Sequence, residues 1–140
     1  MITYKNIISL VFICACFNLF GQTGLSKKQQ EKEANKVEMF SSEEKDSIQI
    51  RFYNRVVDMD LSDSTMESYR EIITTNVYKM RRLNDKDSNN TPKMVIEKFD
   101  ALVASTNKEV KPLLTKEQYT MHLKNFGVLA ESVKQKFDND

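Results

Sequence analysis

Apolar side chains recur at helical spacing in four stretches of the chain. Three stripes run through residues 48–59, 66–80 and 95–110, with steps of three or four residues between apolar positions. The clearest stripe is the last, with spacings of four, three, four, three and four: Tyr119, Leu123, Phe126, Ala130, Val133 and Phe137. No stretch alternates with period two over a useful length. The pattern therefore predicts an all-α fold with four main helices.

Each predicted helix is preceded by a residue that suits an N-cap. These residues are Ser41, Ser62, Thr91 and Thr115. Thr115 is followed three residues later by Gln118, which favours a capping box. Leu114 before the cap and Tyr119 in the first turn are placed to form a hydrophobic staple. The start of the fourth helix is therefore the best-defined boundary in the chain.

Loop signals separate the helices. Residues 84–90 are rich in Asn and Asp and contain no apolar side chain, which is typical of a loop. Pro112 prevents a clean helical continuation, so we expect the third helix to end or kink near Val110. We expect four main helices in antiparallel helical hairpins, forming a thin elongated bundle that dimerises.

The N-terminus has the layout of a secretory signal peptide. Residues 7–20 are almost wholly apolar, follow Lys5, and precede Gly21, where we expect cleavage before Gln22. This predicts a periplasmic or secreted protein. An uncleaved anchor is an alternative, although the run is short of the ~20 apolar residues of a span. A second alternative is a lipoprotein in which Cys16 becomes the lipidated first residue. Cys14 fits the lipoprotein cleavage pattern poorly.

The remaining organisation follows from composition. We expect a signal peptide at 1–21, a flexible or weakly helical polar lead-in at 22–40, a helical domain at 41–137 and a tail at 138–140. Both cysteines lie in the leader, so the mature chain would lack disulfides and thiol chemistry. Loss of Lys5 balances the charges, which gives no reason to expect nucleic-acid binding.

The sequence contains no catalytic or metal-binding signature. His122 is the single histidine and has no second ligand at a suitable spacing, so we interpret it as a surface residue. Asp58, Asp60 and Asp63 do not fit a calcium loop, and helix capping explains them better. We therefore expect no enzyme activity, no cofactor and no bound metal.

Two features favour protein binding. The mature chain is rich in methionine, whose flexible side chain suits varied apolar partners. Basic residues lie beside apolar ones on the first two helices and could attract acidic or unfolded chains. The candidate binding surface consists of Arg51, Arg55, Met59, Arg70, Lys79, Arg81 and Arg82. The alternative is ordinary core filling by methionine and a solvated face with salt bridges to the many glutamates.

The stretch Leu114-Thr115-Lys116-Glu117-Gln118 resembles the LTxxQ motif of the Spy/CpxP-like periplasmic proteins. A second candidate motif begins at Leu61 and Ser62, where serine replaces threonine, and it has Thr65 in place of glutamine. The resemblance covers roughly residues 41–137. The residue pattern itself explains Leu61, Ser62, Leu114, Thr115 and Gln118 as helix-capping positions.

The resemblance implies a dimeric, ATP-independent chaperone or envelope-stress protein that holds unfolded or partner proteins on an amphipathic helical surface. Some members of the family are metal sensors, but this chain lacks their histidine-rich character. The alternative is a regulatory partner of a membrane-bound sensor without general chaperone activity. In either case we expect a homodimer and no stable membrane insertion after the signal peptide is removed.

Overall fold

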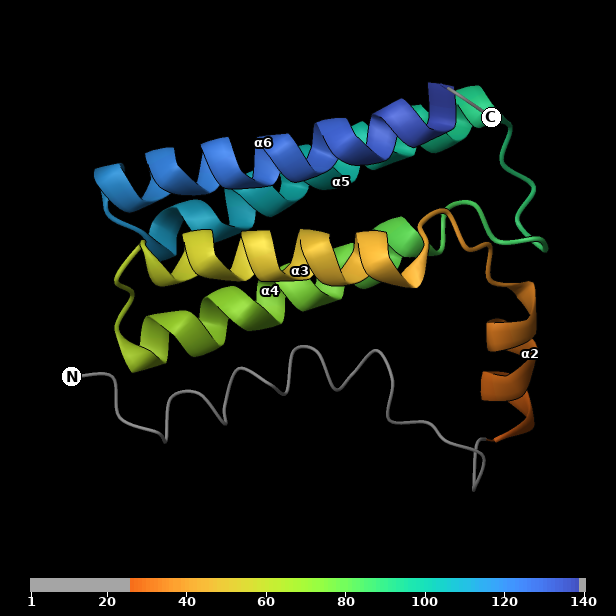
Figure 1. Cartoon of the computed structure of the whole chain (residues 1–140), viewed down its shortest axis with the longest axis horizontal. Coiled ribbons are helices and arrows are strands. Elements are labelled where there is room, and N and C mark those ends of the chain that lie inside the picture. Colours follow the sequence, from red (N-terminus) through yellow and green to blue (C-terminus); the bar gives the residue numbers. More distant parts are fainter. Residues whose placement is uncertain (1–25, 139–140) are drawn as a thin grey trace. The chain divides into compact units, whose positions relative to one another are not determined.

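The computed structural model describes residues 26–138 and is all-helical over that range (Figure 1). The predicted signal peptide, Cys16 and the last two residues of the tail lie outside the described residues. The chain divides into two units, Met1–Asn35 and Lys36–Asp140. In the described part of the first unit, helix α2 (Lys27–Asn35) buries no side chain, consistent with its polar sequence.

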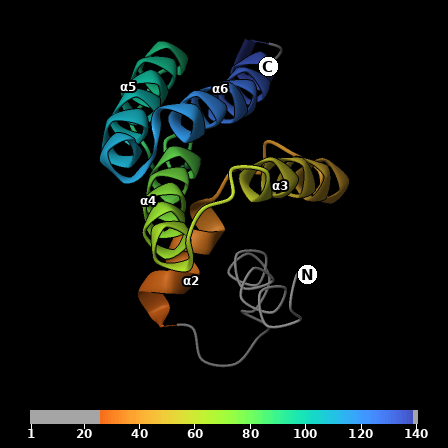
Figure 2. The ribbon, with the colours of Figure 1, turned by 90° about the vertical axis from the view of Figure 1, so that its left-hand side faces the viewer.

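The second unit contains four longer helices and one turn of 3₁₀ helix. They are α3 (Ser42–Val57), α4 (Asp63–Arg81), α5 (Pro92–Val110), η1 (Lys111–Leu113) and α6 (Lys116–Asp138). Consecutive helices run in opposite directions (Figure 1). Helix α5 packs against α4 and α6, and α6 packs against α3 (Figure 2). The prediction of an all-α fold with four main helices is confirmed.

The predicted helix starts are also confirmed. The side chains of Ser41, Ser62, Thr91 and Thr115 each accept a hydrogen bond from the backbone N–H three residues later, at 3.2–3.3 Å. Pro92 occupies the first turn of α5, where its missing N–H costs nothing. Before Pro112, α5 ends at Val110, as expected.

The interior is formed by side chains from all four helices. Its buried apolar members are Val56, Met59, Tyr69, Ile73, Met80, Phe99, Val110, Phe126 and Ala130. Within residues 26–138, no helix combines the length and apolar character that a membrane crossing requires.

The predicted stripe of α6 is wrong at Leu123. That side chain is 41 % exposed, whereas the neighbouring His122 is 0 % exposed and Asn125 is also buried. Adjacent residues of an α-helix project about 100° apart, so only one of residues 122 and 123 can face the centre of the interior. The polar residue faces inward because α4 and α5 supply hydrogen-bond partners for its ring.

Candidate protein-binding surfaces

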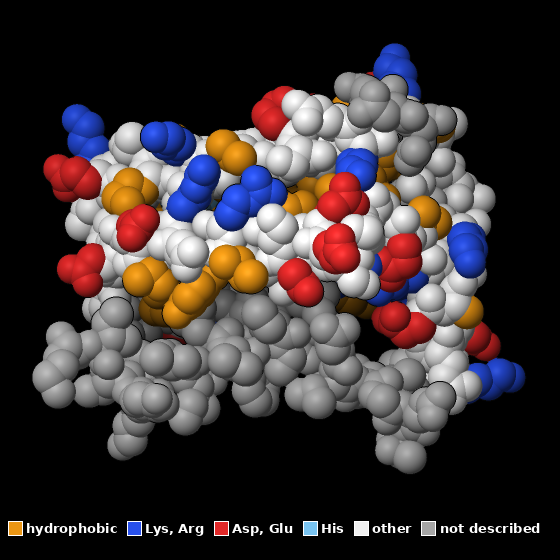
Figure 3. All heavy atoms as spheres, in the orientation of Figure 1, with side chains coloured by type: hydrophobic (Ala, Val, Ile, Leu, Met, Phe, Trp, Pro, Cys, Tyr) orange, Lys and Arg blue, Asp and Glu red, His pale blue; other side chains and the backbone are white. Residues whose placement is uncertain are grey.

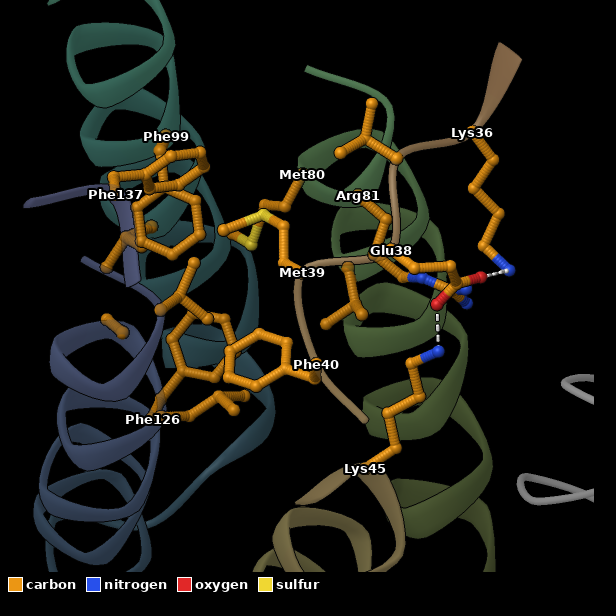
Figure 4. A pocket seen from close by; sticks show the side chains of 16 residues that line it. Lys36, Glu38, Met39, Phe40, Lys45, Met80, Arg81, Phe99, Phe126 and Phe137 are labelled. Atoms are coloured by element: carbon orange, nitrogen blue, oxygen red, sulfur yellow. Dashed lines mark hydrogen bonds and ion pairs between the residues drawn. The ribbon is translucent and has the colours of Figure 1, made fainter. Parts of the chain in front are cut away.

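A cleft with an almost wholly apolar lining opens within the second unit (Figure 4). Its volume is about 110 Å³, and α4, α5 and α6 form its walls. The aromatic and methionine side chains that line it are Met39, Phe40, Met80, Phe99, Phe126 and Phe137. We call this opening the phenylalanine cleft, and its helical wall includes Met80, Phe99, Phe126 and Phe137. It contains the adaptable side chains that suit apolar ligands of varied shape.

The remaining side of the phenylalanine cleft is an irregular segment, residues 36–40, which we call the strap. Val37, Met39 and Phe40 are half-buried, and Figure 4 shows Met39 and Phe40 directed toward the aromatic wall. The strap belongs to the same compact unit as the helices. The predicted lead-in, residues 22–40, therefore extends too far over residues 36–40, because a five-residue segment shows no periodicity that would reveal its packing.

Charged groups hold the strap at its outer side. Glu38 forms ion pairs with Lys36, at 2.7 Å, and with Lys45 of α3 (Figure 4). Hydrogen bonds from Lys36 and then Lys45 lower the pKa of Glu38 to about 2. At the other end of the strap, the Lys136 ammonium lies 5.4 Å from the centre of the Phe40 ring and 2.6 Å from Glu44. The strap is therefore tied to both α3 and α6.

A second, shallower surface lies between α3 and α6. Arg51, Arg55, Asn125 and Val128 contribute to this α3/α6 groove, and Val128 is 48 % exposed. Figure 3 shows Lys and Arg side chains gathered beside hydrophobic ones where these two helices meet. The groove therefore combines positive charge with exposed apolar area.

The structure does not bring the seven predicted surface residues together. Arg51 and Arg55 line the α3/α6 groove, while Arg81 lines the phenylalanine cleft. Arg70 and Lys79 lie on α4 and line neither.

Two of the predicted surface residues have other roles. Met59 was wrongly included, because it is 2 % exposed and belongs to the core. Arg82 forms an ion pair with Asp85 at 2.5 Å, just beyond the end of α4.

The motif residues have a structural role that extends beyond capping. The Thr115 N–H donates to Gln118 Oε1 at 3.0 Å, which completes the predicted capping box. Gln118 Nε2 also donates to the carbonyl oxygen of Met59 at 3.1 Å, which links α6 to the turn after α3. Asp60 in that turn has a positive φ of 48°. Sequence reasoning missed this link because the two residues are far apart along the chain.

The second motif lacks this link. The Ser62 hydroxyl accepts from the Thr65 N–H and donates to the Thr65 hydroxyl at 2.9 Å. A threonine side chain is too short to return to the backbone of the cap as glutamine does. Leu61 and Leu114, which precede the two caps, both pack against the core. The two motifs thus share the cap and the apolar anchor and differ at their last residue.

His122 is buried and was wrongly interpreted as a surface residue. Its Nδ1 lies 2.9 Å from the Tyr69 hydroxyl, and its Nε2 lies 2.9 Å from Asn107 Oδ1. Because the amide oxygen only accepts, Nε2 donates and Nδ1 accepts from the tyrosine. The ring stacks between Tyr119 and Phe126, with centroids 6.1 and 5.3 Å away.

The burial of His122 sets its chemistry. Burial lowers the pKa of His122 to about 4 and raises that of Tyr69, so both groups are neutral near pH 7. Both ring nitrogens of the histidine are already in hydrogen bonds, so its role is to pack α6 against α4 and α5. Among residues 26–138, no group of three His, Cys, Asp or Glu side chains is arranged to hold a metal ion.

Comparison with known protein families, with characterised proteins and with solved structures found no match. Any assignment of function therefore rests on the two surfaces described above and on the sequence motifs.

Proposed function

We propose that this chain is an exported, ATP-independent protein-binding module with chaperone-like activity. The observation that carries the proposal is the phenylalanine cleft, an apolar opening walled by aromatic and methionine side chains. Concave, mostly apolar openings of this kind are characteristic of binding sites. The ligand class that fits such a lining is an apolar segment of another polypeptide.

Two features of the sequence support the same proposal. The Leu114 to Gln118 motif resembles that of the Spy/CpxP-like proteins, which bind unfolded clients without ATP. The apolar run at residues 7–20 is typical of an export signal. A periplasmic location would expose this chain to unfolded proteins in a compartment where an ATP-independent mechanism is suitable.

Suppression of aggregation tests this function directly. The mature chain, residues 22–140, is mixed at increasing ratios with thermally unfolding citrate synthase in the absence of ATP. We expect light scattering to fall markedly near equimolar ratio, because each bound apolar segment is withdrawn from aggregation. Absence of suppression at every ratio would contradict the proposal.

A pair of variants locates the activity on the molecule. Phe137 lines the phenylalanine cleft, and Met94 is an exposed apolar residue on α5 that does not. We expect Phe137→Ser to weaken suppression by about ten-fold, the factor for loss of ~1.4 kcal/mol of apolar contact. Met94→Ser is the matched control and should act like the wild type. Equal effects of the two substitutions would place the activity elsewhere.

The α3/α6 groove favours a second candidate function, that of a regulatory partner for a membrane-bound sensor. Arg51 and Arg55 beside Val128 form a surface of defined charge, which suits one specific acidic partner better than many clients. Capture of a single membrane protein by the immobilised mature chain, abolished by Arg51→Glu, would favour this function. Capture of many unrelated proteins would count against it.

A further inference from the structure

The phenylalanine cleft already holds a segment of its own chain. The strap has no helical structure over residues 36–40, and its Met39 and Phe40 side chains lie against the cleft (Figure 4). Between its apolar residues, Glu38 lies at the edge of the cleft, where its carboxylate pairs with Lys36 and Lys45 (Figure 4). The strap is thus an irregular peptide in which an acidic residue is flanked by apolar ones. It packs against a wall formed by helices.

The helical wall contributes features that do not depend on the strap. Phe99, Phe126 and Phe137 provide the apolar surface, and Lys45 of α3 and Arg81 of α4 lie at its edge. A peptide in the place of the strap would therefore meet the same apolar wall and the same cationic edge. Charge complementarity at this edge selects segments that contain an acidic residue.

We propose that the strap is an internal occupant of the phenylalanine cleft, and that extended client segments with an acidic residue between apolar residues displace it. This inference rests on the proposed function and specifies which client segments the cleft accepts. The apparent affinity for a client is then the intrinsic affinity of the helical wall multiplied by the fraction of molecules in which the strap is displaced. A substitution that weakens the contact between strap and wall increases the affinity for the client without any change to the helical wall.

The ion pair between Glu38 and Lys45 provides a matched test, because either partner can be removed. The probe is a fluorescein-labelled peptide with the sequence of residues 36–41, Lys-Val-Glu-Met-Phe-Ser, and a second peptide carries Gln in place of Glu. Binding to the mature chain is measured by fluorescence anisotropy at low salt. Circular dichroism melting curves verify that each variant remains folded.

We expect Glu38→Gln to bind the Glu peptide about two- to five-fold more tightly than the wild type, since a surface ion pair that retains the strap is lost. Met39→Ser should increase affinity more, by about ten-fold, because it removes apolar contact between strap and wall. Lys45→Gln breaks the same ion pair but removes the cation that a peptide carboxylate would meet. That variant should therefore lose the preference for the Glu peptide over the Gln peptide.

The proposal is overturned if Glu38→Gln and Met39→Ser bind the peptide no more tightly than the wild type, or if no variant binds it. This outcome is distinct from failure of the proposed function. Suppression of citrate synthase aggregation with unchanged peptide affinities would retain the chaperone activity and reject the strap as a competitor. Tighter peptide binding without suppression would retain the competition and reject the chaperone activity.

Discussion

His122 shows how one residue can be misjudged from its neighbours in sequence. It precedes Leu123, and the apolar spacing favoured Leu123 as the buried residue of the pair. Its partners Tyr69 and Asn107 lie 53 and 15 residues away along the chain. Only the packing of α4, α5 and α6 reveals that the polar residue is satisfied in the interior, because nothing local to residue 122 indicates those partners.

The burial of His122 predicts a loss of stability in acid. Its pKa is about 4 in the folded chain, against 6.5 ordinarily, so the unfolded chain binds a proton more readily. The contribution of neutral His122 to the free energy of unfolding is fully present above pH 6.5. It is lost as the pH falls toward 4, and the loss reaches at most ~3 kcal/mol. Urea unfolding at pH 7, 5 and 4 measures this loss. His122→Gln should remove that part of the pH dependence, and an equal acid sensitivity of both proteins would show that His122 is not its cause.

At the scale of the helices, local signals were sufficient to predict the starts. Ser41, Ser62, Thr91 and Thr115 each bond to the backbone three residues onward, and such short-range geometry can be read from sequence. The second bond of Gln118 could not be read in this way, since its acceptor, the carbonyl of Met59, is 59 residues distant. The motif thus has two structural roles, of which only the capping role is visible locally.

The substitution Gln118→Glu separates these two roles. A glutamate keeps the oxygen that accepts from the Thr115 N–H, so the capping box remains possible. It cannot donate to the Met59 carbonyl, which is left without that bond. We expect a loss of about 1–2 kcal/mol in the free energy of unfolding, measured by urea denaturation at pH 7. Unchanged stability would show that the motif acts through capping alone.

At the scale of the whole molecule, the helix count and class were predictable, and the candidate binding surface was not. Amphipathic spacing is a property of each helix alone, which is why the four main helices were found. The phenylalanine cleft depends on three helices and on residues 36–40, whose apolar side chains follow no period. The predicted surface residues other than Met59 were chosen by charge, and of these the structure places only Arg51 and Arg55 in the groove and Arg81 at the cleft.

The most direct test of the cleft as the protein-binding site uses its methionines as reporters. The mature chain, labelled with ¹³C at the methionine methyl groups, is titrated with permanently unfolded, carboxymethylated α-lactalbumin and followed by NMR. We predict that the resonances of Met39 and Met80, which line the cleft, shift on binding, and that exposed Met94 does not. If the client binds and the Met39 and Met80 resonances do not shift, the claim that clients bind in the phenylalanine cleft is contradicted.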